Sequence, residues 1–179
     1  EAEFETGFLD HAPMEPLNAT AHFRGNELEV WIPTQSATSA QRAAAAEAGL
    51  DAGQVILNSL LPGGGFGRRL SPDDAAIATQ VALKKDVPVQ TLFTREDTTR
   101  HGTYRPQALQ ILRAGLDADG WPVAWHHRVT GPTPAGLMTG GSENPNYSFP
   151  NYLVDSALED WGIPLGPLRS VAHPHLAFA

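Results

Sequence analysis

The sequence predicts an α+β fold in which mixed β-sheets carry flanking helices. Three kinds of pattern indicate it. Short apolar or alternating runs typical of strands recur at residues 27–33, 54–61 and 88–94. Segments with helix start and stop signals lie between those runs, at 36–50 and 71–87. Two further alternating runs, joined by a turn sequence, form a hairpin pattern at 108–129.

In the first half of the chain, ELEVWIP at 27–33 alternates as a half-buried strand does. The segment SATSAQRAAAAEAGL at 36–50 starts with Ser and Thr residues and has a glycine near its end, as helices do. The apolar run QVILNSLL at 54–61 then predicts a buried strand that leads directly into a glycine-rich loop.

The second helix has signals at both ends. Ser71 is the expected N-cap and Pro72 the first helical residue. Acidic residues in the first turn and lysines in the last turn complement the helix dipole. PVQTLFT at 88–94 follows as the next strand, and the hairpin is expected to turn at residues 118–120, Ala-Asp-Gly.

The last part of the chain shows little periodicity. Residues 130–150 are rich in Gly, Pro, Ser, Thr and Asn, which predicts a long surface loop or an extended segment. The final thirty residues contain several prolines, and the chain stops abruptly at LAFA, as a truncated chain would. We therefore expect a compact α/β portion at 1–130 and an extended, loop-rich portion at 131–179.

Composition excludes several classes of protein. Twelve basic against 20 acidic residues give a net charge of -8, which argues against electrostatic binding of nucleic acid or an anionic membrane. The absence of cysteine excludes disulfides, thiolate zinc sites and iron–sulfur ligation within the chain. No apolar run approaches the ~18 residues of a membrane span, and EAEFETGF at the start shows no signal peptide.

The stretch LLPGGGFGRRL at 60–70 is the first candidate site. It lies between a predicted strand and a predicted helix N-terminus, where free N–H groups favour anions. It is neither a Walker A loop nor a dinucleotide loop, because Arg68 stands where the third glycine would be. Arg68 and Arg69 would supply charge-assisted bonds to phosphate. The alternative is a flexible connection with two solvated arginines.

Further motifs occur with this loop in one order along the chain: HAPMEPLNATA at 11–21, VWIPTQ at 30–35, GGGFGRR at 63–69, TREDTTRHGTYRP at 94–106 and LRSVAH at 168–173. Together they resemble the molybdenum-binding subunit of the xanthine dehydrogenase and aldehyde oxidoreductase family, and more narrowly the beta subunit of isoquinoline 1-oxidoreductase. The resemblance covers nearly all of the chain but only the middle portion of such a subunit. It implies part of a molybdopterin-binding domain.

The resemblance assigns roles to two motifs. The glutamine that ends Pro-Thr-Gln lies beside the apical oxygen of the molybdenum centre in the family, which corresponds to Gln35. Its amide group is a suitable donor to such an oxygen. The Gly-Gly-Phe-Gly segment presents backbone N–H groups to the same centre and to the pterin. These roles correspond to Gly64, Gly65, Phe66 and Gly67, in an arrangement like an oxyanion hole.

Arginines complete the implied cofactor site. Arg169 corresponds to the arginine that begins the family's Arg-Ser-Val-Gly-His motif, close to the cofactor. Arg68 and Arg69 are candidates for the pterin or its phosphates, and molybdenum itself is expected to be held through the pterin. Two alternatives stay open: Gln35 caps the helix that starts near residue 36, or Arg169 pairs with one of the many carboxylates.

The sequence departs from the family at three places. Arg69 and Leu70 replace a Lys-Glu pair that contacts purines in the xanthine-type enzymes, so a purine substrate is disfavoured. Ala172 replaces the glycine before His173, which adds a methyl group where the chain approaches the cofactor. The glutamate that acts as general base has no counterpart, so we expect no catalytic residue in this chain and no turnover by the chain alone.

The resemblance implies a molybdenum hydroxylase that hydroxylates N-heterocycles or oxidises aldehydes with oxygen from water. It implies molybdopterin in the cytosine dinucleotide form, [2Fe–2S] clusters on a small partner subunit, the remainder of the molybdenum subunit, and a periplasmic or cytoplasmic location in a bacterium. Two other hypotheses are a scaffold or interaction domain of the same fold without molybdenum, and a binder of a nucleotide-like anion.

The histidine pairs give weaker signals. His126 and His127 lie on a predicted strand, so their side chains are expected on opposite faces and cannot share one metal ion. His173 and His175 have a spacing that allows a shared metal ion, but the sequence offers no third ligand nearby. Ordinary surface histidines are the simpler interpretation.

Overall fold

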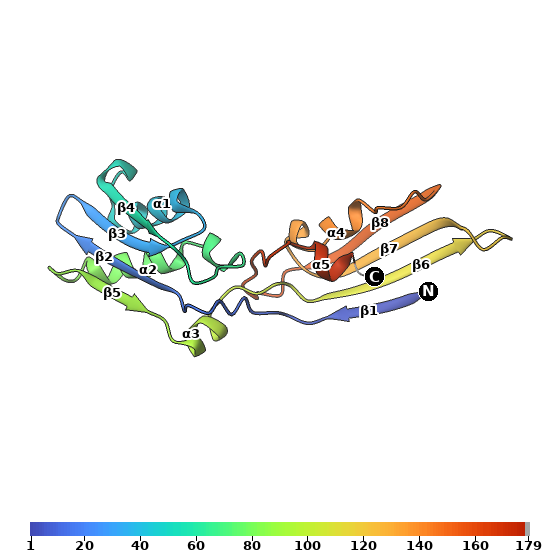
Figure 1. The fold of residues 1–179 in the computed structure, drawn as a ribbon, viewed down its shortest axis with the longest axis horizontal. Helices are drawn as coiled ribbons and strands as arrows, with labels where there is room; N and C mark the ends of the chain where they lie inside the picture. The colour runs from blue at the N-terminus through green and yellow to red at the C-terminus, as the bar shows by residue number, and fades with distance from the viewer. Residues whose placement is uncertain (178–179) are drawn as a thin grey trace. The chain divides into compact units, whose positions relative to one another are not determined.

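The computed structural model describes residues 1–177, which form two compact units (Figure 1). The central unit is His11–Gly102. The terminal unit combines Glu1–Asp10 with the chain from Thr103 onward. This division differs from the expected boundary at residue 130. The reason is a long-range strand pairing: β1 (Ala2–Thr6) is antiparallel to β6 (Ala108–Leu116), so the first residues belong with the C-terminal half.

The central unit has a four-stranded mixed sheet with the order β4-β3-β2-β5. Its strands are β2 (Asn18–Phe23), β3 (Leu28–Pro33), β4 (Val55–Leu60) and β5 (Val89–Leu92). β2 is antiparallel to both β3 and β5, whereas β3 and β4 are parallel. The strands expected near 27–33, 54–61 and 88–94 are therefore confirmed, and β2 was not predicted.

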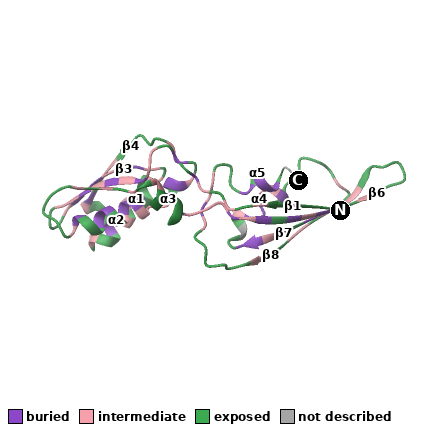
Figure 2. Cartoon of the chain, turned by 90° about the horizontal axis from the view of Figure 1, so that it is seen from below, coloured by how far each residue is buried: buried purple, intermediate pink, exposed green. Residues whose placement is uncertain are grey.

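Two helices cover one face of this sheet: α1 (Ala37–Ala48) and α2 (Asp73–Ala82). Their buried apolar side chains are all alanines, which let the helices approach the alternating Leu28, Val30 and Ile32 of β3 closely, and Figure 2 shows this buried interior. Among residues 1–177, no helix has the length and apolar character needed to cross a membrane.

Three local predictions in this unit were wrong. β4 was expected to be a buried strand, but it is an edge strand that pairs only with β3, and Val55 is its only fully buried residue. The N-cap of α2 is Pro72 rather than Ser71, and no side chain caps the helix. A 3-10 turn at Arg68–Leu70 stands between the glycine loop and α2, so the loop does not lead directly into that helix.

The terminal unit is built on a second mixed sheet, with the order β1-β6-β7-β8. The predicted hairpin is present as β6 and β7 (Pro122–Pro132), with Gly120 at a φ of 88° in its turn. The expected long loop contains a 3-10 turn at Ala135–Leu137 and the short helix α4 (Gly140–Glu143). β8 (Asn151–Glu159), which is parallel to β7, was not predicted, because none of its residues is fully buried and its apolar pattern is weak.

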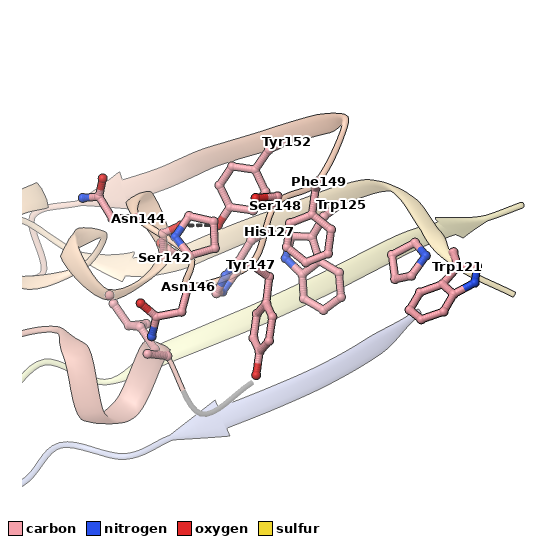
Figure 3. Close-up of a pocket in the computed structure, with 15 residues that line it drawn as sticks. Trp121, Trp125, His127, Ser142, Asn144, Asn146, Tyr147, Ser148, Phe149 and Tyr152 are labelled. Atoms are coloured by element: carbon pink, nitrogen blue, oxygen red, sulfur yellow. Dashed lines mark hydrogen bonds between the residues drawn. The ribbon is translucent and has the colours of Figure 1, made fainter.

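The interior of the terminal unit has two parts. A small apolar cluster joins the sheet to α5 (His173–Leu176) and consists of Ala108, Val129, Met138, Ala172 and Leu176. Beside it, aromatic rings stack in a row (Figure 3). The ring of Phe149 is stacked on Trp125 at 5.2 Å and on Tyr152 at 5.8 Å, between ring centroids.

The short helix α3 (Arg95–Arg100) of the central unit depends on a capping box. The Oγ1 atom of Thr94 accepts the N–H of Asp97 at 3.1 Å, and the Asp97 carboxylate accepts the N–H of Thr94 at 3.1 Å. We expect Thr94→Ala to destabilise this helix by about 1 kcal/mol. Hydrogen exchange of residues 95–100 should become about fivefold faster, and Thr94→Ser should retain the wild-type rate. Unchanged exchange in the alanine variant would show that α3 does not need its cap.

Candidate functional site

The glycine loop after β4 has a backbone that few residues adopt. Gly64 and Gly67 have φ angles of 98° and 103°, in the left-handed region where glycine is strongly favoured. Phe66 lies between them with a φ of 53°, which is costly for an aromatic residue. The side chain of Phe66 is nevertheless 41% exposed, so burial of its ring within the chain does not explain the strained backbone. Such a conformation is typical of sites that hold a ligand.

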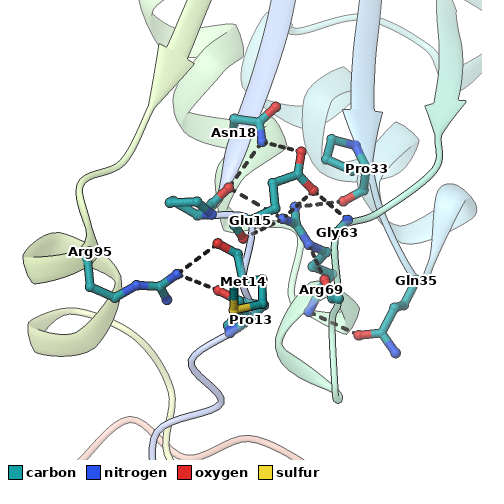
Figure 4. Close-up of polar contacts among 11 residues, drawn as sticks. Pro13, Met14, Glu15, Asn18, Pro33, Gln35, Gly63, Arg69 and Arg95 are labelled. Atoms are coloured by element: carbon teal, nitrogen blue, oxygen red, sulfur yellow. Dashed lines mark hydrogen bonds and ion pairs between the residues drawn. The ribbon is translucent and has the colours of Figure 1, made fainter.

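Gln35 holds this loop from the end of β3. Its Oε1 atom accepts the N–H groups of Gly67 at 3.0 Å and Arg69 at 3.3 Å, as Figure 4 shows in part. Only the carbonyl end of an amide can accept an N–H, so these bonds fix the orientation of the side chain. The Nε2 group, a donor, is therefore at the exposed end. No side-chain bond from Gln35 to the start of α1 is seen within residues 1–177, so the structure does not support the capping alternative.

Gly65 lies directly beneath the Gln35 side chain. A Cβ atom at this position would be 2.4 Å from Oε1 and 2.7 Å from Cδ of Gln35. A Cβ atom does not make non-bonded contacts this short, so any side chain at residue 65 must displace the glutamine. The two motifs identified in the sequence, Pro-Thr-Gln and the glycine loop, are thus parts of one packed structure.

The backbone N–H groups of the loop agree only in part with the prediction that residues 64–67 present them to a ligand. The N–H of Gly67 is engaged by Gln35 and does not face outward. The N–H groups of Gly64, Gly65 and Phe66 have no hydrogen-bond partner within the described part of the chain. Together with the Gln35 amide, they form a set of donors on one loop. This set fits an oxygen-rich or anionic group, which is the kind of group that a molybdopterin cofactor presents.

Arg69 has a different environment from the one expected. Its side chain is fully buried, and it donates to the carbonyl oxygens of Gly64 at 2.9 Å and Pro33 at 3.0 Å. It also donates to the backbone oxygen and the carboxylate of Glu15, both at 3.0 Å (Figure 4). Because its guanidinium group is engaged inside the unit, Arg69 is a support of the loop and not a solvated phosphate ligand.

Glu15 extends this support to the other side of the loop. Its carboxylate accepts the N–H of Gly63 at 2.7 Å and the amide of Asn18 at 3.0 Å. Burial acts to raise the pKa of Glu15, but these two bonds and the charge of Arg69 lower it below its ordinary value. Glu15 therefore stays ionised at neutral pH. The HAPMEP motif, which sequence analysis linked to the site only through the resemblance, contributes this residue.

Arg68 is buried as well and pairs with Asp73, with an Nη1–Oδ1 distance of 2.9 Å. The next residue, Asp74, is only 2% exposed, and its Oδ2 atom has no hydrogen-bond partner within the described part of the chain. Burial, with a smaller contribution from Asp73, raises the pKa of Asp74 to about 6. Acidic side chains therefore occupy the first turn of α2, so the dipole of α2 does not support the anion binding that was predicted for the loop.

Arg169 lies in the terminal unit, outside the group formed by Gln35 and residues 64–69. It is exposed and has no ion-pair partner among residues 1–177, which disagrees with the pairing alternative. The three residues after it have positive φ angles, with 48° at Ala172. The methyl group of Ala172 packs in the apolar cluster of the terminal unit and is 3% exposed, so it lies in the core rather than on an open surface.

The first histidine pair agrees with its prediction and the second does so only in part. His126 contacts Asp155 and His127 contacts Gln110, each at 3.0 Å, from opposite faces of β7. His175 is buried, unlike an ordinary surface histidine, while His173 is exposed. Within the described residues, no group of three His, Asp or Glu side chains is arranged to hold a metal ion.

Known proteins with similar sequences include a protein family and several oxidoreductases. A family model described as "Molybdopterin cofactor-binding domain" matches residues 1–146. The membrane-bound aldehyde dehydrogenase [pyrroloquinoline-quinone] of Gluconacetobacter polyoxogenes is 30% identical over 141 residues, which are 77% of this chain and 18% of that protein. Isoquinoline 1-oxidoreductase subunit beta of Brevundimonas diminuta is 32% identical over 130 residues, 71% of this chain and 16% of that protein.

Solved structures show the same fold. The aldehyde oxidoreductase of Desulfovibrio gigas superposes with a TM-score of 0.82 at 20% identity, over 99% of this chain and 21% of that one. The chain thus spans about a fifth or less of the length of the proteins it matches. The family model covers most of the chain, including Gln35, the glycine loop and the supporting Glu15 and Arg69. The chain therefore belongs to the molybdopterin cofactor-binding domain family and corresponds to part of a molybdenum-binding subunit.

Proposed function

We propose that this chain is the part of a molybdenum hydroxylase subunit that presents Gln35 and the loop at 64–67 to a molybdopterin cofactor. One observation carries the proposal. The Oε1 atom of Gln35 is fixed by two backbone N–H groups of the loop, which leaves its amide donor exposed beside loop N–H groups without partners in the described chain. A donor set that is built before the ligand arrives needs little reorganisation on binding.

The residues of the chain bind and orient the cofactor in this proposal. The amide of Gln35 donates to an oxygen of the bound group, and the N–H groups of Gly65 and Phe66 donate beside it. Arg69 and Glu15 hold the loop from behind. The cofactor contact that the resemblance implies for Arg169 stays a prediction. The cofactor supplies the two-electron oxidation of the substrate with oxygen from water.

The finer features of the function follow the resemblance. The substrate is an N-heterocycle or an aldehyde, the pterin is in its cytosine dinucleotide form, and a small subunit with [2Fe–2S] clusters accepts the electrons. The location is the periplasm or cytoplasm of a bacterium. Because the family's general base has no counterpart in these 179 residues, turnover requires the remainder of the molybdenum subunit.

A scaffold domain without molybdenum is the second hypothesis. Its support from Ala172 is weaker in the structure, because the methyl group lies in the core of the terminal unit. A further hypothesis, the quinone hypothesis, follows from the name of the Gluconacetobacter relative, which includes pyrroloquinoline quinone instead of molybdenum. The decisive experiment must therefore measure both cofactors.

We expect Gly65→Ala to lower bound molybdenum severalfold without unfolding the protein. The added Cβ displaces Gln35, against which it would lie at 2.4 Å. The protein should be purified from its native host, and molybdenum and quinone should be measured by elemental and mass analysis. Gly53→Ala is the matched control, since a Cβ there meets nothing within 4 Å and Gly53 has no positive φ.

The outcomes separate the three hypotheses. Molybdenum in the wild type and in Gly53→Ala, but much less in Gly65→Ala, supports the proposal. Quinone without molybdenum supports the quinone hypothesis, and the absence of both cofactors supports the scaffold hypothesis. If molybdenum is present and unchanged in Gly65→Ala, the loop does not bind the cofactor.

A further inference from the structure

The terminal unit contains a cavity of about 630 Å³ that the proposed function does not use. This volume falls within the range of roughly 300–1,000 Å³ typical of small-molecule sites. Aromatic side chains line it, among them Trp121, Trp125 and Tyr147, together with polar ones such as His127, Ser142 and Asn146 (Figure 3). A cavity with aromatic walls and a few polar groups has the composition of a ligand site.

The aromatic walls combine rings stacked on one another with rings that are largely exposed. Trp125, Phe149 and Tyr152 stack on one another with interplanar angles of 16° and 10°. Tyr147 is 76% exposed and Trp121 is 71% exposed, although both line the same cavity. Aromatic rings prefer offset stacking or edge contacts with other rings. A flat ring is therefore the shape that complements these walls.

A buried chain of hydrogen bonds fixes the tautomer of His127. The Nε2 group of Gln110 donates to the backbone oxygen of His175 at 2.6 Å, so the Oε1 atom of Gln110 faces His127. An amide oxygen only accepts, and the Nε2 atom of His127 lies 3.0 Å from it. His127 must therefore carry its proton on Nε2, which leaves Nδ1 as the ring nitrogen with a lone pair.

The charge state of His127 agrees with this assignment. The side chain is 4% exposed, and burial lowers its pKa, with a smaller contribution from the charge of His126. The imidazole is therefore neutral at pH 7. Since His127 lines the cavity and its Nε2 is engaged by Gln110, Nδ1 is the atom of this ring that accepts a hydrogen bond from a ligand.

We propose that this cavity binds a planar aromatic compound that carries an N–H or O–H donor. The flat ring stacks on the walls formed by Trp125 and Tyr147, and its donor binds Nδ1 of His127. Neither Gln35 nor the glycine loop takes part, so the proposal does not depend on the proposed cofactor.

Three related probes test whether the ligand needs a hydrogen-bond donor. Quinolin-2-one has an N–H group. N-methylquinolin-2-one carries a methyl group in its place, and quinoline has no N–H group and no added bulk. Isothermal titration calorimetry on the protein from its host should give a dissociation constant about tenfold lower for quinolin-2-one than for the other two. Equal affinity for all three probes would contradict the hydrogen bond to His127, and no binding of any probe would overturn the site.

One variant tests the aromatic wall. Tyr147→Ala should weaken binding of all three probes about tenfold, since stacking on one aromatic side chain has that order of effect. Tyr147 is largely exposed, so the variant should fold. Leu116→Ala, at a residue of β6 that is 61% exposed and does not line the cavity, is the control and should bind as the wild type does.

A last control separates this cavity from the cofactor site. Quinolin-2-one binding should persist in Gly65→Ala protein, even where molybdenum is lost. Loss of probe binding together with molybdenum would place the probe at the cofactor and overturn the proposal. Loss of molybdenum with probe binding retained would support both proposals independently.

Discussion

Arg69→Met is expected to lower the free energy of unfolding of the central unit by about 2–4 kcal/mol, because the carbonyl oxygens of Gly64 and Pro33 lose a charged donor inside the unit. The Arg69 side chain is fully buried and bonds Gly64, Pro33 and Glu15. Methionine fills similar space but donates no hydrogen bond. The carboxylate of Glu15 would lose its cation, and two buried carbonyl oxygens would lose their donor.

Hydrogen exchange read by mass spectrometry checks this, because it reports residues 11–102 separately from the terminal unit. Arg69→Lys keeps the charge but loses the planar fork of donors, so we expect an intermediate loss. Arg24→Met is the matched control, since the Arg24 side chain is 50% exposed in its pairs with Glu27 and Glu29. Its expected cost is about 1 kcal/mol or less. Equal effects of the two methionine substitutions would show that Arg69 is not the support of the loop.

Local patterns in the sequence predicted the elements that carry this site, because their signals lie within a few residues. The alternation of ELEVWIP located β3, and the helix after it was expected close to its observed bounds. A turn sequence located the hairpin of β6 and β7. These features depend on periodicity and turn chemistry, which a single stretch of chain contains.

Contacts between distant residues could not be predicted in the same way. Glu15 and Arg69 are 54 positions apart, and no periodicity links them. Arginines are rarely buried, so the composition of GGGFGRR favoured solvated or ligand-binding side chains. The pairing of β1 with β6 likewise joins segments more than 100 residues apart. The resemblance located Gln35 and the loop, but only the structure shows that one holds the other.

Asp74 should make the central unit less stable as the pH rises, in contrast to the usual behaviour of a carboxylate. Burial raises its pKa from an ordinary value of 3.8 to about 6. Below pH 3.8 the residue is protonated in both the folded and the unfolded state. Between that pH and 6 the unfolded chain releases the proton while the folded chain keeps it, so the free energy of unfolding falls. A shift of about two pH units corresponds to about 3 kcal/mol, which is fully lost above pH 6.

Asp74→Asn isolates this effect, because other carboxylates such as Glu15 and Asp73 have lowered pKa values and contribute the opposite trend. An asparagine still accepts the N–H of Ala75, which Oδ1 of Asp74 accepts at 3.0 Å. We expect the variant to exceed the wild type in stability by about 3 kcal/mol at pH 8 and to approach it at pH 4. Urea unfolding of the central unit at both pH values measures the difference.

Asp86→Asn in the same unit provides the control, since it removes one negative charge at an exposed position and leaves the buried carboxyl of Asp74 in place. A stability difference that stays constant between pH 4 and pH 8 in Asp74→Asn would contradict the raised pKa. If the expected difference is found, α2 retains a buried carboxyl that destabilises the unit at neutral pH, beside the arginines that support the loop. Substitution by a neutral residue should then increase stability without changing the donors that face the cofactor, and molybdenum content in Asp74→Asn would show whether the loop uses that charge.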